Sequence, residues 1–430
     1  MAVHQSQTRP GWMRLDNAAK IYPAARRNGW SSLFRLSMTL TEPVDTAVLQ
    51  SALDVTVLRF PSISTRLKKG LFWYYLEQVS QPPEIRTESC YPMVYMGKKE
   101  AANCLFRVIV YGRRIAVEFF HSLTDGSGGL VFLKTLVAEY LQQRYGANIP
   151  NTHGILDRNE EPKVEELEDS FQKYAGPVAA GRKQTAAWYI PGTPEPAGFA
   201  NVTCLSMPVD QIRGKAKEYG LSVTNFLGTA VMMALQNHQQ ECQKNPMKRK
   251  PIKVQLPVNL RNIFPSRTLR NFALYVIPEI DPRLGEYTFE EIGKIVQSYM
   301  ALGATDKQMG RTIAANVGSE RMLAVKLMPL FVKNIIMKAV FNAVGEKAYC
   351  LSLSNLGAMQ LPEEMGRFVE RVDFINGLQA TRPHNCGVIS WGDTLYMNFI
   401  RSIREPDLER HVACVLRDMG ISVTVQSNGR

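Results

Sequence analysis

A histidine followed at a fixed spacing by an aspartate and a glycine is the strongest candidate for chemistry in this chain. It lies in "RRIAVEFFHSLTDGSGGLVFLKTL" (113–136), where His121 ends an alternating run and Asp125 and Gly126 follow after three residues. Because side chains alternate along a strand, His121 is the polar end of an apolar row. A partly desolvated imidazole in such a place is a good general base near neutral pH. It would take the proton of an alcohol or amine that attacks an acyl carbonyl.

The turn after the histidine accounts for the other two residues. Asp125 can reverse the chain, and Gly126 can take a positive φ without steric cost. The carboxylate would hold the loop through a charged partner rather than touch the substrate. From the residue frequencies of this chain, a chance HxxxDG has odds on the order of one in a hundred, which favours a function.

Three other interpretations of the motif stay open. The run "DGSGG" is similar to the "GDSGG" of serine proteases, but its order differs and no GxSxG elbow surrounds Ser127. His121 and Asp125 could be two metal ligands, although no third His or Cys stands nearby in the sequence, so we expect no metal. His121 could also be a structural, hydrogen-bonded residue.

The composition is that of a soluble globular protein with an excess of positive charge. The chain has 430 residues, 45% of them hydrophobic, which is enough for two domains and a sizeable core. Its net charge of +12 favours an anionic partner: nucleic acid, a membrane surface, a phosphorylated cofactor or an acidic carrier protein. The seven cysteines form no CxxC pair, and the N-terminal stretch lacks the apolar core of a signal peptide. We therefore expect a cytoplasmic protein.

Hydrophobic patterns predict two lobes, 1–150 and 201–430, joined by a proline-rich connector at 151–200. Each lobe is expected to combine a sheet with helices in an α/β (α+β layered) arrangement. The predicted strands are 33–41, 71–78, 104–111, 115–121, 252–258, 272–278, 349–355, 386–391 and 394–400. The predicted helices are 45–58, 130–144, 210–219, 406–418, several across 289–344, and one capped by Ser222 or Thr224.

The segment "MLAVKLMPLFVKNIIMKAVFNAV" (322–344) has the pattern of a cationic amphipathic helix. Its lysines and asparagines fall within roughly half of a helical wheel, and the rest is apolar. Such a helix could make a peripheral contact with a membrane or cover an apolar tunnel. It could also pack against the core and leave a lysine edge in solvent.

Several segments, in order along the chain, resemble the HxxxDG acyltransferase superfamily, which includes chloramphenicol acetyltransferase and peptide-synthetase condensation domains. "HSLTDG" (121–126) resembles its motif, and "ALDVTVLRFPSISTRL" (52–67) resembles its early helix and strand. "GLSVTNFLGTAVMMAL" (220–235) and "VQLPVNLRNIFPSRTLRNFALYV" (254–276) are similar to its second-lobe helix and its arginine-bearing segment. "LSLSNLG" (351–357) is similar to a serine-bearing strand of the alcohol acetyltransferase branch. The resemblance covers roughly residues 12 to 420.

The resemblance implies two chloramphenicol-acetyltransferase-like lobes with a tunnel between them and the active histidine midway along it. Carried over by position, His121 is the general base and Gly126 keeps its loop tight. Asp125 is structural and forms a salt bridge to an arginine, for which Arg261 is the candidate. The implied reaction joins an acyl thioester and an acceptor directly, without a covalent enzyme intermediate.

The same resemblance implies three further site residues. Ser354 or Asn355 would donate a hydrogen bond to the tetrahedral oxyanion, and Asn271 would line the tunnel. The sequence differs from two branches of this superfamily. Phe120 stands where condensation domains usually carry a second histidine, and the DFGWG motif of plant BAHD enzymes is absent. The bacterial alcohol acetyltransferase or polyketide-associated branch remains.

The hypothesis is an O- or N-acyltransferase that uses acyl-coenzyme A or an acyl carrier protein as co-substrate and a small-molecule acceptor. We expect no permanently bound cofactor. The basic run "KNPMKRKPIK" (244–253), with Lys248, Arg249 and Lys250, could meet coenzyme A phosphates or a carrier protein, or be a solvated loop. Nucleic acid is not expected, because no binding motif accompanies the charge.

A monomer is expected, because the predicted site needs no second subunit. The alternative function, from another class, is a non-catalytic protein of the same fold that binds an acyl ligand or a carrier protein. Loss of His121 would abolish turnover in the first case and leave the function intact in the second.

Overall fold

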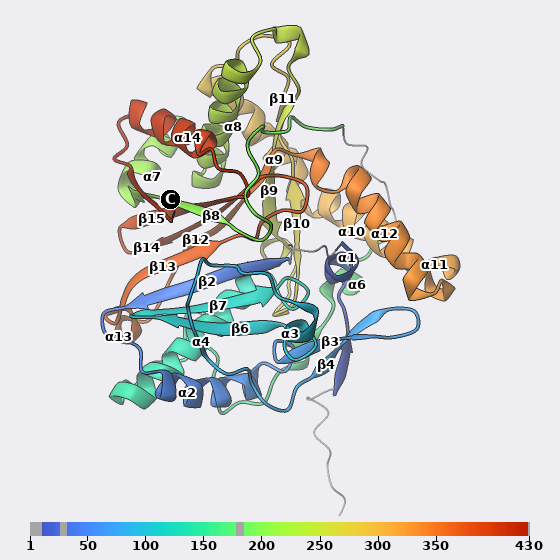
Figure 1. Ribbon diagram of the computed structural model, residues 1–430, viewed down its shortest axis with the longest axis vertical. Helices are drawn as coiled ribbons and strands as arrows, with labels where there is room; N and C mark the ends of the chain where they lie inside the picture. Colours follow the sequence, from blue (N-terminus) through green and yellow to red (C-terminus); the bar gives the residue numbers. More distant parts are fainter. Residues whose placement is uncertain (1–10, 26–31, 178–184, 429–430) are drawn as a thin grey trace, which may run out of the picture.

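Two large β-sheets, stacked one above the other, form the frame of the molecule (Figure 1). The computed structural model describes residues 11–25, 32–177 and 185–428. A five-stranded sheet has the order β13-β2-β7-β6-β5, and an eight-stranded sheet has the order β10-β9-β12-β14-β15-β8-β16, with β11 also paired to β9. A third sheet, β1-β4-β3, has three strands.

The strands carry these bounds: β1 Trp12–Arg14, β2 Leu33–Leu40, β3 Thr65–Lys69, β4 Tyr74–Gln78, β5 Arg86–Thr87, β6 Phe106–Tyr111, β7 Arg114–Phe120, β8 Asn201–Pro208, β9 Ile252–Asn259, β10 Ala273–Val276, β11 Glu279–Ile280, β12 Leu351–Ala358, β13 Val369–Ile375, β14 His384–Trp391, β15 Thr394–Arg401 and β16 Thr424–Ser427. The helices are α1 Ile21–Ala25, α2 Thr46–Arg59, α3 Lys98–Ala101, α4 Gly126–Tyr145, α5 Val164–Leu167, α6 Ser170–Lys173, α7 Val209–Glu218, α8 Val223–Cys242, α9 Phe289–Gly303, α10 Asp306–Arg321, α11 Leu323–Leu327, α12 Leu330–Val344, α13 Glu363–Gly366 and α14 Asp407–Asp418.

The longer helices begin where polar side chains can satisfy their free N–H groups. Asp45 caps α2, Asp125 caps α4, and Thr288 forms a capping box with Glu291 at α9. Of the two caps predicted for α8, the structure uses Ser222, whose hydroxyl accepts a hydrogen bond from the Asn225 backbone N–H. Helices α2 and α4 cover one face of the five-stranded sheet, and α7, α8 and α14 lie over the eight-stranded one (Figure 1).

Strand β13 joins the two halves of the molecule. It comes from the C-terminal half of the chain but pairs antiparallel with β2 in the five-stranded sheet. The sequence analysis predicted no strand there. The hydrophobic core of the N-terminal half continues across this junction, because Ile389 and Ile400 of the larger sheet pack in the same cluster as Phe34 and Phe119. The two sheets therefore share buried surface rather than meeting only at a linker.

The segment 322–344 differs from its prediction. It forms two helices, α11 and α12, which are separated at Met328 and Pro329. Proline disfavours helical backbone in the residue before it and lacks an N–H, so one helix ends and the next begins there. Lys333 is buried, whereas Phe331 and Ile335 are exposed. The expectation of a core-packed helix with a solvated lysine edge is therefore wrong for Lys333 and for the exposed apolar side chains, although Lys326 and Lys338 are exposed as expected.

The connector folds against the first lobe. Glu166 of α5 accepts two hydrogen bonds from Arg59, at 2.5 and 2.8 Å, and both side chains are buried. Within the described ranges, no helix has the length and apolar character that crossing a bilayer requires.

Candidate active site

His121 lies directly after β7, in an aromatic setting provided by two other segments. Its backbone N–H donates to the carbonyl of Ser32 at 2.7 Å. Tyr22 of α1 stacks on the imidazole with the ring centroids 4.7 Å apart, and Phe34 of β2 meets it edge-on at 5.1 Å. The end of a strand and two aromatic rings thus fix the position and the plane of the ring.

A chain of hydrogen bonds holds one nitrogen of that ring. The Nδ1 atom of His121 lies 3.1 Å from Oδ1 of Asn271, and Nδ2 of Asn271 donates to Oδ2 of Asp16 at 3.2 Å. Because Nδ2 of Asn271 donates to the carboxylate, the amide oxygen is the atom that faces the ring. This network assigns the proton to Nδ1 and leaves the lone pair on Nε2, as a general base requires.

Burial sets the protonation of this group. Desolvation lowers the pKa of His121, although a hydrogen bond to its own backbone, the charge of Asp125 and the bond to Asn271 oppose the shift. The imidazole is therefore neutral at neutral pH. Burial also raises the pKa of Asp16, against the opposing charge of Arg270 and the N–H of Ala19, which donates to Oδ1 at 2.7 Å.

Asp125 faces away from the reacting side of His121 and ties the motif to the second half of the chain. Its Oδ1 accepts from the N–H of Gly128 at 3.1 Å and so caps α4. Its Oδ2 accepts from Nη1 of Arg261 at 2.8 Å and from the N–H of Phe272 at 2.9 Å. The structure thus brings Asp125 and Arg261 together as the sequence predicted. The carboxylate positions the loop from behind.

The glycines of the motif serve close packing. Gly126 is the first residue of α4 and has helical backbone, so the positive φ that we expected there is wrong. A Cβ atom at Gly126 would come within 2.7 Å of the side chain of Leu356 on β12, and one at Gly128 would come within 2.2 Å of the Leu269 carbonyl. Both contacts cross between the halves of the chain, so a larger residue would push them apart.

The two oxyanion candidates point in different directions. Asn355 donates from Nδ2 to the hydroxyl of Thr224 at 3.0 Å and accepts from the N–H of Gly357 at 2.8 Å. Its amide is therefore occupied on the side of α8. Ser354 is one residue away along β12, on the same face as Leu356, which touches the start of α4. That face is turned toward the His121 loop, which favours Ser354.

The basic run at 244–253 lies far from His121. It follows α8, whose first turn meets Asn355 through Thr224 and whose 20 residues span about 30 Å. The structure therefore places the segment that follows α8, with Lys248, Arg249 and Lys250, at the opposite end of that helix from Thr224 and does not bring it to the site.

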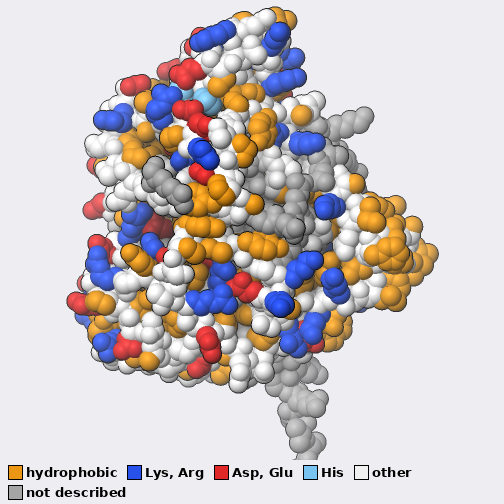
Figure 2. All heavy atoms as spheres, in the orientation of Figure 1, with side chains coloured by type: hydrophobic (Ala, Val, Ile, Leu, Met, Phe, Trp, Pro, Cys, Tyr) orange, Lys and Arg blue, Asp and Glu red, His pale blue; other side chains and the backbone are white. Residues whose placement is uncertain are grey.

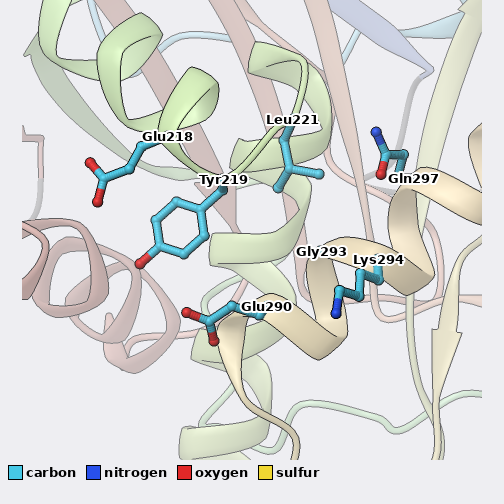
Figure 3. Close-up of a pocket in the computed structure, with 7 residues that line it drawn as sticks. All are labelled: Glu218, Tyr219, Leu221, Glu290, Gly293, Lys294 and Gln297. Atoms are coloured by element: carbon cyan, nitrogen blue, oxygen red, sulfur yellow. The ribbon is translucent and has the colours of Figure 1, made fainter.

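A surface pocket in the second half is also separate from His121. It lies between the end of α7 and α9 and is lined by Glu218, Tyr219, Leu221, Glu290, Gly293, Lys294 and Gln297 (Figure 3). Its charged side chains come from the outer faces of both helices. Nothing in it connects with the motif loop.

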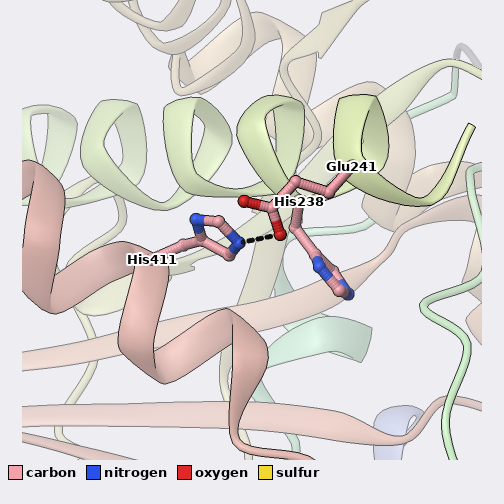
Figure 4. Close-up of side chains that lie close together, drawn as sticks. All are labelled: His238, Glu241 and His411. Atoms are coloured by element: carbon pink, nitrogen blue, oxygen red, sulfur yellow. Dashed lines mark hydrogen bonds and ion pairs between the residues drawn. The ribbon is translucent and has the colours of Figure 1, made fainter. Parts of the chain in front are cut away.

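A cluster between α8 and α14 combines His238, Glu241 and His411, whose ligand atoms lie within 4.8 Å of one another (Figure 4). The ring of His411 shares a hydrogen bond of 3.0 Å with Glu241, and Nη2 of Arg410 lies 3.6 Å from the same carboxylate. A cation would have to displace both contacts and bind beside the guanidinium of Arg410. The cluster is best described as a set of polar contacts that joins α8 to α14.

Sequence reasoning missed Asp16 and Tyr22. Both come from the short N-terminal segments before β2, and neither belongs to a recognisable motif. It also predicted Asn271 as a tunnel-lining residue, whereas the structure buries its amide between the imidazole and Asp16. The position of Asn271 between His121 and Asp16 is seen only in three dimensions, where 270–272 lies beside the motif loop.

Comparison with solved structures finds the same fold over nearly the whole chain. Polyketide synthase associated protein 5 from Mycobacterium tuberculosis aligns with a TM-score of 0.63 and 15% identity, over 95% of this chain and 98% of that one. The F. sporotrichioides TRI101 complexed with coenzyme A and T-2 gives 0.60 and 13%, over 94% and 97%. The first condensation domain of the CDA synthetase gives 0.57 and 15%, over 94% and 95%.

No family model and no curated protein matches the chain at the level of sequence. The two-lobed fold predicted from the resemblance to the HxxxDG superfamily is nevertheless confirmed by the structural alignments.

Proposed function

We propose that the protein is an acyltransferase that moves an acyl group from a thioester donor to an alcohol or amine, with Nε2 of His121 as general base. The observation that carries this proposal is the chain from His121 through Asn271 to Asp16. It fixes the tautomer in which Nε2 can take a proton. A purely structural histidine needs no such arrangement.

The reaction proceeds in two steps. The acceptor O–H or N–H gives its proton to Nε2 as its heteroatom attacks the thioester carbonyl, which forms a tetrahedral oxyanion. Collapse then breaks the carbon–sulfur bond, and the leaving thiolate takes the proton back from Nε2. A positioned base contributes roughly 10²- to 10⁴-fold to such a rate. Holding both substrates at one place between the lobes adds to it.

Ser354 is the donor that we assign to the oxyanion. It shares a strand face with Leu356, which touches Gly126 beside the motif loop. Asn355 is set aside because its amide already bonds Thr224 and Gly357. Asp125 and Arg261 hold the loop in place and do not touch the substrate.

A direct transfer, without a covalent enzyme intermediate, agrees with the state of the buried thiols. Burial raises the pKa of Cys104 and of Cys350 to about 11, so these thiols stay protonated and weakly nucleophilic. Coenzyme A is the donor we favour, because the TRI101 structure that shares this fold is a complex with coenzyme A. A carrier protein would present the same thioester.

The test is acceptor-dependent release of coenzyme A. Purified protein is mixed with acyl-coenzyme A of short, medium and long chain, with and without a panel of alcohols and amines, and free thiol is measured. The expected result is release that needs both substrates and falls by at least about 10²-fold in His121→Ala. The matched control is His153→Asn, since His153 is exposed and has a positive φ that Asn tolerates.

Two outcomes would contradict the proposal. Equal release by wild type and His121→Ala would remove His121 from the chemistry. Tight binding of an acyl ligand, unchanged in His121→Ala and without turnover from coenzyme A or carrier-protein donors, would instead establish the non-catalytic binding protein.

A further inference from the structure

An exposed apolar surface projects from the side of the molecule, and the proposed function makes no use of it. It is formed by α11, α12 and the loop between β3 and β4. The backbone N–H of Leu330, at the start of α12, donates to the carbonyl of Leu71 on that loop at 2.9 Å and so joins the two segments. We call it the apolar tip. Its exposed large side chains are Leu71, Phe72, Met322, Leu323, Leu327, Phe331, Ile335, Ile336 and Val340.

The orientation of α12 is the reverse of that of an ordinary surface helix. Lys333 is only 3% exposed, while Phe331 and Ile335 are each 69% exposed. The ammonium of Lys333 donates to the carbonyl of Phe72 at 2.9 Å and lies 3.8 Å from the centre of the Trp73 ring. Lys333 is thus fixed against the protein, while the apolar side chains of Phe331 and Ile335 are turned outward.

The charges on the two helices of the apolar tip have one sign. From Met322 to Gly345 the sequence contains lysines but no aspartate or glutamate. Lys326 and Lys338 are exposed on the two helices, and Lys69 is exposed at the base of the neighbouring loop. Apolar side chains flanked by lysines are complementary to a layer with an apolar interior and an anionic surface.

The shape of the apolar tip also matters. Figure 1 shows α11 standing out from the body, and Figure 2 shows hydrophobic side chains gathered over it at the edge of the molecule. The surface is convex rather than hollowed. A convex apolar projection can sink into a deformable layer, whereas a protein partner would need a matching groove. Patches of this extent on a soluble monomer mark an interaction site.

We propose that the apolar tip inserts into the headgroup region of an anionic lipid bilayer and holds the protein on its surface. Helix α12 has 15 residues, fewer than the roughly 20 needed to span, and lies in the plane of the boundary. It contacts α1, whose Tyr22 stacks on His121. Docking would therefore bring the site beside the membrane. Binding itself does not depend on the proposed function.

The test is sedimentation of the full chain with vesicles of phosphatidylcholine, alone or with a share of phosphatidylserine. Wild type is expected to bind the anionic vesicles more tightly. The variant Leu327→Glu/Phe331→Glu/Ile335→Glu is expected to lose binding by ten-fold or more. Leu284→Glu is the control, because Leu284 is 81% exposed but lies on the loop between β11 and α9. All of these side chains are exposed, so circular dichroism should show intact folds.

A second pair of variants separates the charge from the apolar contact. Lys326→Gln/Lys338→Gln should reduce binding to anionic vesicles about 10- to 30-fold, since each lysine near the surface contributes about 1 kcal/mol. It should leave the weaker binding to neutral vesicles unchanged. His121→Ala should bind like wild type, which distinguishes failure of this proposal from failure of the proposed activity.

Three results would overturn the proposal. One is that wild type binds neither kind of vesicle. Another is that the triple Glu variant still binds like wild type. The third is a wild-type dimer that the triple Glu variant dissociates, in the absence of vesicle binding, which would make the apolar tip an interface between copies of the chain.

Discussion

His121 and His411 each lie near a carboxylate, and the two contacts are built in different ways. At His121 the carboxylate of Asp16 is fully buried and acts through the amide of Asn271. At His411 the carboxylate of Glu241 contacts the ring directly, at 3.0 Å, and its side chain is 54% exposed. A neutral amide fixes the tautomer without stabilising the imidazolium strongly. At His411 the ring and the carboxylate share a hydrogen bond with no amide between them.

The difference bears on the proposed role of His121 as a general base. Desolvation lowers the pKa of His121, so the ring is neutral and ready to accept a proton. Burial acts against ionisation of Glu241, but its bond with His411 holds the pKa of that carboxylate below its usual value. The second pair is therefore a direct polar contact between α14 and α8. The hydrogen-bond partner, more than the presence of a histidine, separates a site from a structural contact.

The largest expected effect is on the rate. His121→Ala should lower kcat/KM by roughly 10²- to 10⁴-fold, because the acceptor loses its base. His411→Ala should change kcat/KM by less than about two-fold, since it touches neither substrate nor the motif loop. Both are measured by thiol release from acyl-coenzyme A. A comparable loss in the two variants would mean that the contrast between the clusters has no catalytic meaning.

The next effect is on stability. Asp125→Ala leaves the largely buried guanidinium of Arg261 without its carboxylate partner and removes the cap of α4. Breaking such a buried pair costs about 3–5 kcal/mol in the free energy of unfolding. We expect a clear fall in the denaturant midpoint and a loss of activity. Glu241→Ala, which breaks the more exposed pair, should shift the midpoint by less than about 1 kcal/mol.

The placement of His121 and Asp125 could be predicted from the sequence because its determinants are local. The end of a strand and the turn after it follow from alternation and turn chemistry within a short stretch, but the cap that Asp125 forms on α4, which begins at Gly126 rather than near residue 130, was not predicted. Arg261 followed from the resemblance alone. The contacts of Asp16 and Tyr22 with the site were not predicted, because they depend on how the N-terminal segments fold back over β7. The pairing of β13 with β2 and the exposed apolar face of α12 were not predicted for the same reason. A short apolar pattern does not reveal which surface it packs against.

Asn271 offers a smaller and more specific test. In Asn271→Leu the ring loses the acceptor at Nδ1, and a hydrogen bond to a group that becomes charged is worth about 1.5–3 kcal/mol. We expect kcat to fall roughly 10- to 100-fold with little change in KM. The same bond raises the pKa of His121, so the acid limb of the kcat/KM profile should also move to lower pH. A lower rate with an unmoved limb would mean that Asn271 only supports the fold.

The pH profile of the wild type is the smallest effect and depends most directly on the comparison. The pKa of His121 is lowered from the ordinary histidine value of 6.5 by burial, so the neutral base persists when the pH falls to that value. The acid limb of kcat/KM should then lie below pH 6.5, and the rate should be lost only as the pH falls through the lowered pKa. The free energy of unfolding changes with pH in the same direction. As the pH falls, His121 takes up its proton in the unfolded chain before it does so in the folded one, so the stability that it contributes above pH 6.5 is lost on acidification. An acid limb above 6.5 would show that the nearby charges outweigh desolvation at His121, and the contrast between the two clusters would not hold.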